Sequence, residues 1–397
     1  MASGTRTHGP DPDRQVGVGL AGPVSVDPSL VERAVRLLGA SRRPLFAGLA
    51  TDVAGMRSAL DLAERCGGVT DHLHGAARMI NLVPLQQHGG QLTTLAEVRN
   101  RADLINFVGG EPLAAFPRFE ERILAPAGPF IDPAIGRRCV RIGANQAVNL
   151  PVALDLPGDL HDVMALLDTT LMLLEAGGAD PAKPLAGHLA SRPDLPAARA
   201  WLQLLQASAY PVFIWAAANW PVALGQRLSL RLMRLVSALN RKGRAAALPM
   251  GGNDGEASAE AVHLWRTGFP LRSAFTPEGV RFDPVAHDAG GLLARGDVDS
   301  LVWISGLGIA HPPPDTSLPS IVLGPPGMAN SASLFIPVGT PGIDHDAHLV
   351  RMDRVVTMYL RQTGAVSATR ERLPSVAQVL QAVLSGLQAT SSIPVAD

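Results

Sequence analysis

One stretch of the chain decides its fold class. Residues 45–68 read LFAGLATDVAGMRSALDLAERCGG. The first six residues are apolar and have the length of a buried strand. Met56, Leu60 and Ala63 then recur at helical spacing, and the two final glycines are typical of a helix end. The stretch therefore predicts a buried strand followed by a helix, the unit from which parallel α/β sheets are built.

The same alternation continues along most of the chain. Apolar runs of strand length are separated by segments in which apolar residues recur every three or four positions. These patterns predict strands over residues 45–50, 103–108, 139–142, 210–216, 246–249, 300–304, 320–324 and 333–338. They predict helices over residues 27–39, 56–66, 94–102, 160–176, 195–208, 224–242, 259–267 and 375–387. The sequence thus predicts an α/β protein with parallel sheets covered on both faces.

Composition excludes several classes of function. The 34 lysines and arginines nearly balance the 35 aspartates and glutamates, and the formal net charge is −1. The chain therefore lacks the basic character of a protein that binds nucleic acid or an acidic membrane surface. Charged residues make up only 17% of the chain, so we expect much of its surface to be apolar or covered by partners. A length of 397 residues predicts two or three domains.

The two cysteines, Cys66 and Cys139, are too few for a cysteine-ligated iron–sulfur cluster, a zinc ribbon or a disulfide scaffold. We interpret both as buried free thiols in a reducing compartment. Residues 1–25 have no apolar core of signal-peptide length. The most apolar stretch, residues 207–225, is interrupted by prolines, which favours a buried strand over a membrane span. These features predict a soluble, cytoplasmic protein.

Three segments carry residues suited to chemistry. In the first, residues 71–75, His72 and His74 would point to the same side of an extended chain and could share one zinc ion. The further ligands of such a site would come from Asp344, His345, Asp346 or His348. The alternative is that both are ordinary loop histidines, satisfied by hydrogen bonds or by water.

The other two segments follow predicted strands. Gly306 and Gly308 match the start of a dinucleotide-binding turn, but His311 stands near the place of the third glycine and prolines follow it. Residues 251–255, GGNDG, could cradle an anion with backbone N–H groups or simply form a tight loop. The chain has no GxSxG elbow, phosphate loop or HExxH helix. This scarcity favours a protein that supports chemistry carried out elsewhere.

Several runs of sequence, taken in order, resemble one known family. They are residues 62–75, 95–103, 110–112, 117–118, 265–270, 293–299, 336–338 and 351–353. At these runs the chain resembles the B subunit of formylmethanofuran dehydrogenase, a member of the molybdopterin oxidoreductase superfamily. The resemblance implies parallel-sheet, Rossmann-like domains. It also implies a discontinuous α/β domain over residues 31–150 plus 246–370, with an inserted helical α/β domain over residues 151–245. The polar start, rich in glycine and proline, predicts an extended or disordered arm over residues 1–30, and we expect a C-terminal helix and tail over residues 371–397.

Two departures from the family pattern bear on function. The dehydrogenases bind molybdenum or tungsten through a cysteine or selenocysteine that directly precedes a His-Gly pair. Here His74 and Gly75 are present, but Leu73 precedes them, and its isobutyl group cannot ligate a metal. The family also begins with a cysteine cluster for an iron–sulfur centre, whereas no cysteine precedes Cys66 in this chain. The resemblance thus implies the fold without the iron–sulfur domain and without redox chemistry.

One branch of the family fits these losses. The chain resembles the B subunit of the bacterial formyltransferase/hydrolase complex, which acts in the one-carbon metabolism of methylotrophs. That complex transfers a formyl group from formyl-tetrahydromethanopterin to a methanofuran-like carrier and then releases formate. The resemblance implies a non-catalytic structural subunit with no cofactor. Its partners would be an amidohydrolase-like hydrolase subunit, a formyltransferase subunit and a C subunit.

Under this interpretation the ancestral cofactor site is vestigial, and we expect no catalytic residue and no bound metal in this chain. The candidates for the vestigial site are Leu73, His74, Gly110, Glu111, Gly252, Asn253 and Gly306. The alternative is a zinc-dependent hydrolase that uses His72, His74 and the cluster from Asp344 to His348, with Asp344 or Asp346 as the base.

Overall fold

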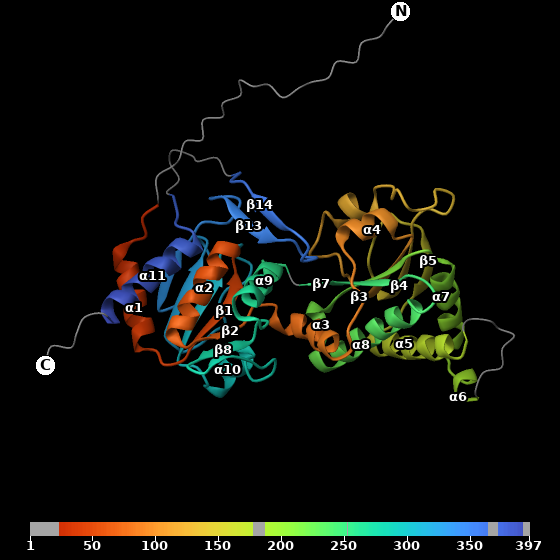
Figure 1. Ribbon diagram of the computed structural model, residues 1–397, viewed down its shortest axis with the longest axis horizontal. Coiled ribbons are helices and arrows are strands. Elements are labelled where there is room, and N and C mark those ends of the chain that lie inside the picture. Colours follow the sequence, from red (N-terminus) through yellow and green to blue (C-terminus); the bar gives the residue numbers. More distant parts are fainter. Residues whose placement is uncertain (1–23, 178–186, 252, 364–371, 392–397) are drawn as a thin grey trace, which may run out of the picture.

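Two sheets built mainly from parallel strands organise the chain (Figure 1). The computed structural model describes residues 24–177, 187–251, 253–363 and 372–391. The first sheet has the strand order β12 (Leu334–Pro337), β11 (Ser320–Gly324), β10 (Ser300–Ser305), β1 (Pro44–Ala50), β2 (Val69–Thr70), β8 (Ser273–Thr276) and β9 (Gly279–Phe282). The second has the order β5 (Val152–Leu156), β4 (Arg138–Ala144), β3 (Leu104–Gly110), β6 (Pro211–Ala216) and β7 (Ala246–Met250). The predicted α/β class with parallel sheets is confirmed.

Helices cover both sheets, and a short antiparallel hairpin is formed by β13 (Ala347–Val350) and β14 (Thr357–Leu360). The helices are α1 (Pro28–Ala40), α2 (Val53–Cys66), α3 (Gly75–His88), α4 (Leu95–Arg101), α5 (Leu160–Glu175), α6 (Gly187–Ala190), α7 (Leu195–Ala207), α8 (Val222–Leu239), α9 (Glu256–Thr267), α10 (Ala289–Arg295) and α11 (Val376–Ser391). A π-helical turn spans Glu120–Leu124, and a 3-10 turn spans Ala217–Asn219. Among the described residues, no helix has the length and apolar character needed to cross a membrane.

The stretch that decided the fold class forms β1 and α2, as predicted. All seven residues of β1 are buried, because parallel neighbours lie on both edges and helices pack on its faces. The carboxylate of Asp52 accepts a hydrogen bond from the Gly55 N–H and so caps the first turn of α2. Gly67 ends the helix with a φ of +64°, a conformation that glycine adopts without strain. Helices α1, α2 and α11 share one apolar core with this sheet.

The second sheet carries the largest apolar core. Helices α5, α7 and α8 pack against one of its faces, and the stripe predicted along residues 224–242 is buried there. Trp201 of α7 is fully buried and donates its indole N–H to the side-chain oxygen of Asn106 at 2.9 Å. The hydrogen bond satisfies a polar atom in the middle of β3, which would otherwise destabilise the core.

The sheets divide the chain differently from the expected boundaries at residues 150 and 246. Strands β3, β4 and β7 pair with β6 in the second sheet, directly or through a neighbour, and none of them joins β1. Periodicity in the sequence identifies a strand but does not specify its neighbours, which explains the difference. Residues 1–23 of the expected arm and residues 392–397 of the expected tail lie outside the described residues, whereas the C-terminal helix is present as α11.

The chain crosses between the two sheets at two places. It leaves the first sheet after β2 through α3, and it returns after β7 through the loop that precedes α9 (Figure 1). Helix α3 was not predicted from the sequence, since it contains Pro84 and lacks a strong apolar stripe. It is fixed instead by tertiary contacts with α8 and β6: its Asn81 accepts hydrogen bonds from Ser229 of α8 at 3.3 Å and from Trp215 of β6 at 2.8 Å.

Candidate functional site

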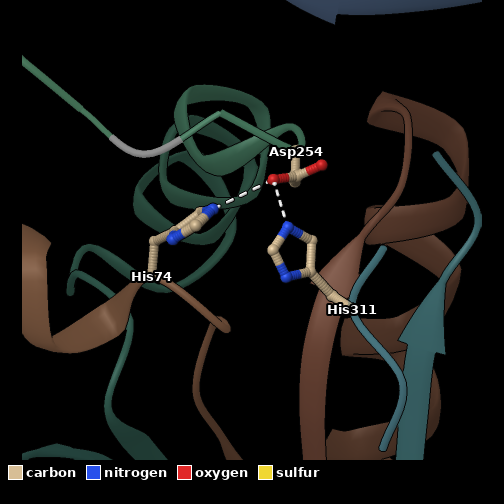
Figure 2. Close-up of side chains that lie close together, drawn as sticks. All are labelled: His74, Asp254 and His311. Atoms are coloured by element: carbon tan, nitrogen blue, oxygen red, sulfur yellow. Dashed lines mark hydrogen bonds and ion pairs between the residues drawn. The ribbon is translucent and has the colours of Figure 1, made fainter. Parts of the chain in front are cut away.

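The three segments singled out in the sequence bring His74, Asp254 and His311 close together (Figure 2). His74 follows β2 and immediately precedes α3, Asp254 lies between β7 and α9, and His311 lies in the loop after β10. One oxygen of Asp254, Oδ2, lies 3.0 Å from Nε2 of His74 and 3.1 Å from Nε2 of His311. Loops at the carboxyl ends of parallel strands are where α/β proteins commonly place binding sites. We call these three residues the His–Asp–His cluster.

His72 holds two of these loops together and is not available as a fourth member. The His74 backbone N–H donates to Nδ1 of His72 at 3.0 Å, so the proton of the His72 ring resides on Nε2. Nε2 then donates to the backbone carbonyl of Asp254 at 3.1 Å. Burial and the neighbouring His74 lower the pKa of His72 to about 3, so the ring is neutral near pH 7. Of the two interpretations of His72, these contacts favour a hydrogen-bonded loop histidine over a metal ligand shared with His74.

Asp254 is the anionic centre of the cluster. The hydrogen bond from His74 holds the pKa of Asp254 below its usual range, against the opposing effect of partial burial, and His311 adds to the lowering. Its backbone has a φ of +56°, and Gly255 follows with a φ of +75°. Aspartate tolerates this left-handed conformation better than most residues, and the turn directs the carboxylate toward both histidines.

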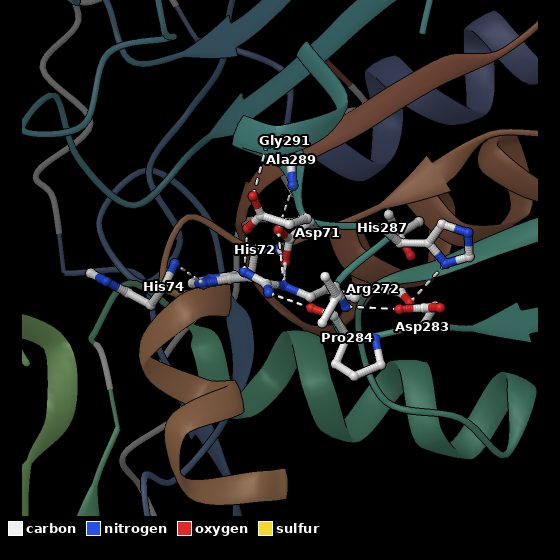
Figure 3. A network of polar contacts seen from close by, with 12 residues as sticks. Asp71, His72, His74, Arg272, Asp283, Pro284, His287, Ala289 and Gly291 are labelled. Carbon is white, nitrogen blue, oxygen red and sulfur yellow. Dashed lines mark hydrogen bonds and ion pairs between the residues drawn. The ribbon is translucent and has the colours of Figure 1, made fainter. Parts of the chain in front are cut away.

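A second polar network lies beside the cluster, around Asp71 and Arg272 (Figure 3). Oδ2 of Asp71 accepts from the Ala289 N–H at 2.9 Å, and Oδ1 lies 3.3 Å from Nε of Arg272. Arg272 also pairs with Asp288. Both Asp71 and Arg272 are buried, and burial raises the pKa of Asp71 to about 6 although Arg272 opposes the shift. The network joins the loop after β2 to β8 and α10 and has the character of a structural support.

The residues of this network line a cavity of about 310 Å³, and Leu73 also lines it. Leu73 packs against an apolar cluster that includes Leu45 and Trp303. Its position is where the dehydrogenase resemblance implies a metal-binding thiolate, yet a hydrocarbon side chain offers no donor atom. A cavity of this volume lies at the lower end of the range for small-ligand pockets. The residues present therefore do not fit a tungsten or molybdenum ligand sphere.

The remaining candidates for the vestigial site are spread around the ends of both sheets. Gly110 and Glu111 are exposed at the end of β3, and Glu111 accepts a backbone hydrogen bond from Ala114. Asn253 reaches the neighbouring loop and donates to the Ala115 carbonyl at 3.4 Å. The Gly306 N–H donates to the Ala50 carbonyl at 2.7 Å. Gly252 lies outside the described residues.

The acidic and histidine residues from Asp344 to His348 do not join the cluster. In the part of the chain that the structure describes, the His–Asp–His cluster alone brings three such ligand atoms within 4.8 Å of one another. Asp344 accepts from the Thr340 N–H at 2.8 Å, and Asp346 accepts from the Tyr359 hydroxyl at 2.6 Å. These side chains stabilise the turn and the hairpin that contain them. The alternative of a zinc hydrolase with these ligands is therefore not favoured.

The sequence pattern marks the loops that carry Asp254 and His311 but does not predict that they meet His74. Asp254 is 180 residues from His74 along the chain, and β2 and β7 belong to different sheets. The available signal was positional for two of the loops, because β7 and β10, which precede them, are recognisable from their apolar runs, whereas the two-residue strand β2 is not. The order of strands in the two sheets is what brings the three loops together, and the sequence pattern does not specify that order.

Comparison with known proteins gives consistent relatives. No family model matches the chain. The chain is 30% identical over 328 residues to the B subunit of the formyltransferase/hydrolase complex of Methylorubrum extorquens, covering 81% of this chain and 84% of that protein. It is 25% identical over 360 residues to the B subunit of the tungsten-containing formylmethanofuran dehydrogenase 2 of Methanocaldococcus jannaschii, covering 82% of this chain and 76% of that protein.

A solved structure agrees with the sequence matches. The fold is similar to one chain in the crystal structure of the formyltransferase/hydrolase complex FhcABCD from Methylorubrum extorquens in complex with methylofuran. The TM-score is 0.76 at 25% sequence identity, and the match covers 92% of this chain and 97% of that one. Sequence and fold thus point to the same complex over most of both chains. The chain belongs to the family of formyltransferase/hydrolase complex B subunits.

Proposed function

We propose that this chain is a non-catalytic structural subunit of a formyltransferase/hydrolase complex. In the proposed complex a formyl group passes from formyl-tetrahydromethanopterin to a methanofuran-like carrier and is then hydrolysed to formate. The catalytic steps would take place on a hydrolase subunit of amidohydrolase type and on a formyltransferase subunit, and a C subunit would complete the assembly. Family membership supports the assignment to such a complex.

The single observation that carries the non-catalytic role is Leu73. A tungsten-containing dehydrogenase subunit is similar to 82% of this chain. In this chain, however, the residue before His74 and Gly75 is a leucine, which offers no metal donor. The two thiols cannot replace it, because Cys66 lies on α2 and Cys139 lies on β4. We infer that the fold descends from the molybdopterin oxidoreductases, without their iron–sulfur domain and without their redox centre.

The surface is consistent with a chain that other subunits cover. Trp265 on α9 is 66% exposed, and Tyr359 on β14 is 56% exposed. Val355, close to Tyr359 on the same hairpin, is 55% exposed. Isolated apolar residues such as Trp265 are common on protein surfaces, but neighbouring ones, as on the hairpin, favour a protein–protein contact. In the proposed complex the hairpin and the end of α9 would contact neighbouring subunits.

The test is to produce the chain together with the other subunits of its own complex and to compare wild type with His74→Gln. A structural role predicts that the assembled His74→Gln complex releases formate at a rate within about twofold of wild type. Omission of the chain should prevent assembly, and elemental analysis should detect neither tungsten nor molybdenum. His188→Gln, at an exposed histidine on α6, is the matched control. Loss of formate release from an intact His74→Gln complex would show that the chain contributes a catalytic group.

A further inference from the structure

We propose that His74, Asp254 and His311 bind one divalent transition-metal ion, best matched by zinc, and that this ion joins both connections between the sheets to the loop after β10. The inference goes beyond the proposed function, since a structural ion is compatible with a catalytic or a non-catalytic chain. It rests on the geometry of the His–Asp–His cluster and on the topology that brings its members together.

The donor set suits a borderline metal. Two imidazole nitrogens and one carboxylate oxygen are typical zinc ligands, and imidazole selects zinc and its neighbours over magnesium or calcium. The ligand atoms of a tetrahedral zinc ion lie about 3.3 Å apart, given metal–ligand distances of about 2.0–2.2 Å. The two observed contacts to Oδ2 of Asp254, at 3.0 and 3.1 Å, are close to that spacing. All three atoms lie within 4.8 Å of one another, so small rotations of the two rings would complete the site.

Hydrogen bonds hold the three loops of the site in place, and its ligand side chains are partly exposed to solvent. His72 fixes the relative position of the loops that carry His74 and Asp254, as an outer hydrogen-bond partner does in known metal sites. Trp303 donates its indole N–H to the His311 carbonyl at 3.2 Å and so restrains the third loop. The exposed fractions of the side chains are 19% for His74, 24% for Asp254 and 40% for His311. An ion can therefore enter from solvent, and water would occupy the remaining coordination position.

The topology gives the ion a structural consequence. His74 stands at the start of α3, where the chain leaves the first sheet, and Asp254 stands in the loop by which it returns. His311 lies in the loop that connects β10 to β11, and both of these strands belong to the first sheet. A metal held by all three would cross-link both connections to the first sheet. Because the ligands are distant in sequence, the site exists only in the folded chain, so zinc binding would stabilise the fold.

The test uses the full chain, stripped with a chelator, dialysed and titrated with zinc sulfate. Wild type should retain one zinc per chain by elemental analysis and should show a melting temperature that rises with zinc concentration. Asp254→Asn keeps the size of the side chain, and asparagine also tolerates the left-handed backbone. Asp254→Asn and His311→Ala should each weaken zinc binding at least about tenfold. His348→Ala, a histidine outside the cluster, should bind as wild type does.

Hydrogen exchange tests the cross-link itself. Zinc should slow exchange in all three peptides, the one that contains His74, the one that contains Asp254 and the one that contains His311. It should slow exchange in none of them in His311→Ala. Absence of bound zinc in wild type would overturn the proposal. Equal zinc binding by wild type, Asp254→Asn and His311→Ala would also overturn it, because the ion would then lie elsewhere. Neither result would count against the proposed structural role of the chain, because that role is tested separately by assembly and formate release.

Discussion

Replacement of Arg78 by methionine should destabilise the fold far more than a surface arginine replacement. Arg78, on α3, makes two hydrogen bonds to Glu260 on α9 and lies 3.6 Å from Glu256. Arg354, in the turn between β13 and β14, completes the network at 2.7 Å from Glu256. The two glutamate side chains are each 2% exposed and that of Arg78 is 12% exposed. The four charges cancel, and α3 is thereby bound to the first sheet.

The magnitude follows from what the substitution leaves behind. Without Arg78, two buried carboxylates face a single guanidinium, and removal of one partner from a buried ion pair costs about 3–5 kcal/mol. Burial alone would raise the pKa of Glu256, but Arg354 and Arg78 hold it below its usual range. In the variant that pKa should rise. The loss of unfolding free energy should therefore be largest near pH 7 and smaller at acidic pH, where a glutamate is protonated.

Urea unfolding followed by circular dichroism measures the effect. Arg36→Met is the matched control, because Arg36 pairs with Glu32 at 2.8 Å with both side chains about two-thirds exposed. This control should cost less than about 1 kcal/mol. The double variant Arg78→Met with Glu260→Leu should recover part of the loss, since it removes the uncompensated charge. If Arg78→Met costs no more than Arg36→Met, the reasoning about buried charge is refuted.

Three further predictions follow from other parts of the fold. Burial raises the pKa of Cys66 to about 11 and also raises that of Cys139. Iodoacetamide at pH 8 should therefore label both thiols much more slowly in the folded chain than in the urea-unfolded chain, as followed by mass spectrometry. Equal labelling rates would contradict this. The pKa of Asp71 is about 6 when folded and 3.8 in its ordinary state, so the folded chain holds this proton more tightly and the contribution of Asp71 to stability is lost as pH rises from 4 to 6. The unfolding free energy of wild type minus that of Asp71→Asn should fall by at most about 3 kcal/mol over that range, and a difference independent of pH would be inconsistent with the shift. Gly48 has a φ of +75°, and a Cβ there would lie 2.6 Å from the Ile304 carbonyl oxygen. Gly48→Ala should therefore cost about 2 kcal/mol or more in urea unfolding, whereas Gly308→Ala, in open space, should cost little.

Local pattern predicted the elements well where burial and period agree. The seven buried residues of β1 and the apolar stripe of α8 lie close to the predicted positions. The pattern did not predict α3, because its formation depends on contacts with a helix far along the chain. The two cysteines are free, as predicted, but only Cys139 is fully buried.

Long-range pairing was beyond what local periodicity can specify. Each strand of a parallel sheet is apolar on both faces, so the sequence of β3 does not distinguish β1 from β6 as its neighbour. The same limit applies to the site. The loops that hold His74, Asp254 and His311 each had a recognisable feature, yet their meeting depends on the strand order of two sheets.

The polar side chains around the proposed vestigial site satisfy one another, and this bears on how the chain remains folded. A buried polar group without a partner costs about 1–3 kcal/mol, so loss of a large ligand would normally destabilise the loops that once held it. Here hydrogen bonds join His72, His74 and Asp254, His311 lies 3.1 Å from the same carboxylate, and Leu73 fills part of the adjoining space. Among the described residues, the buried side-chain atoms that lack a partner belong to other parts of the chain. A structural subunit needs such self-sufficiency, because its stability then depends on its own contacts and on those with its neighbours.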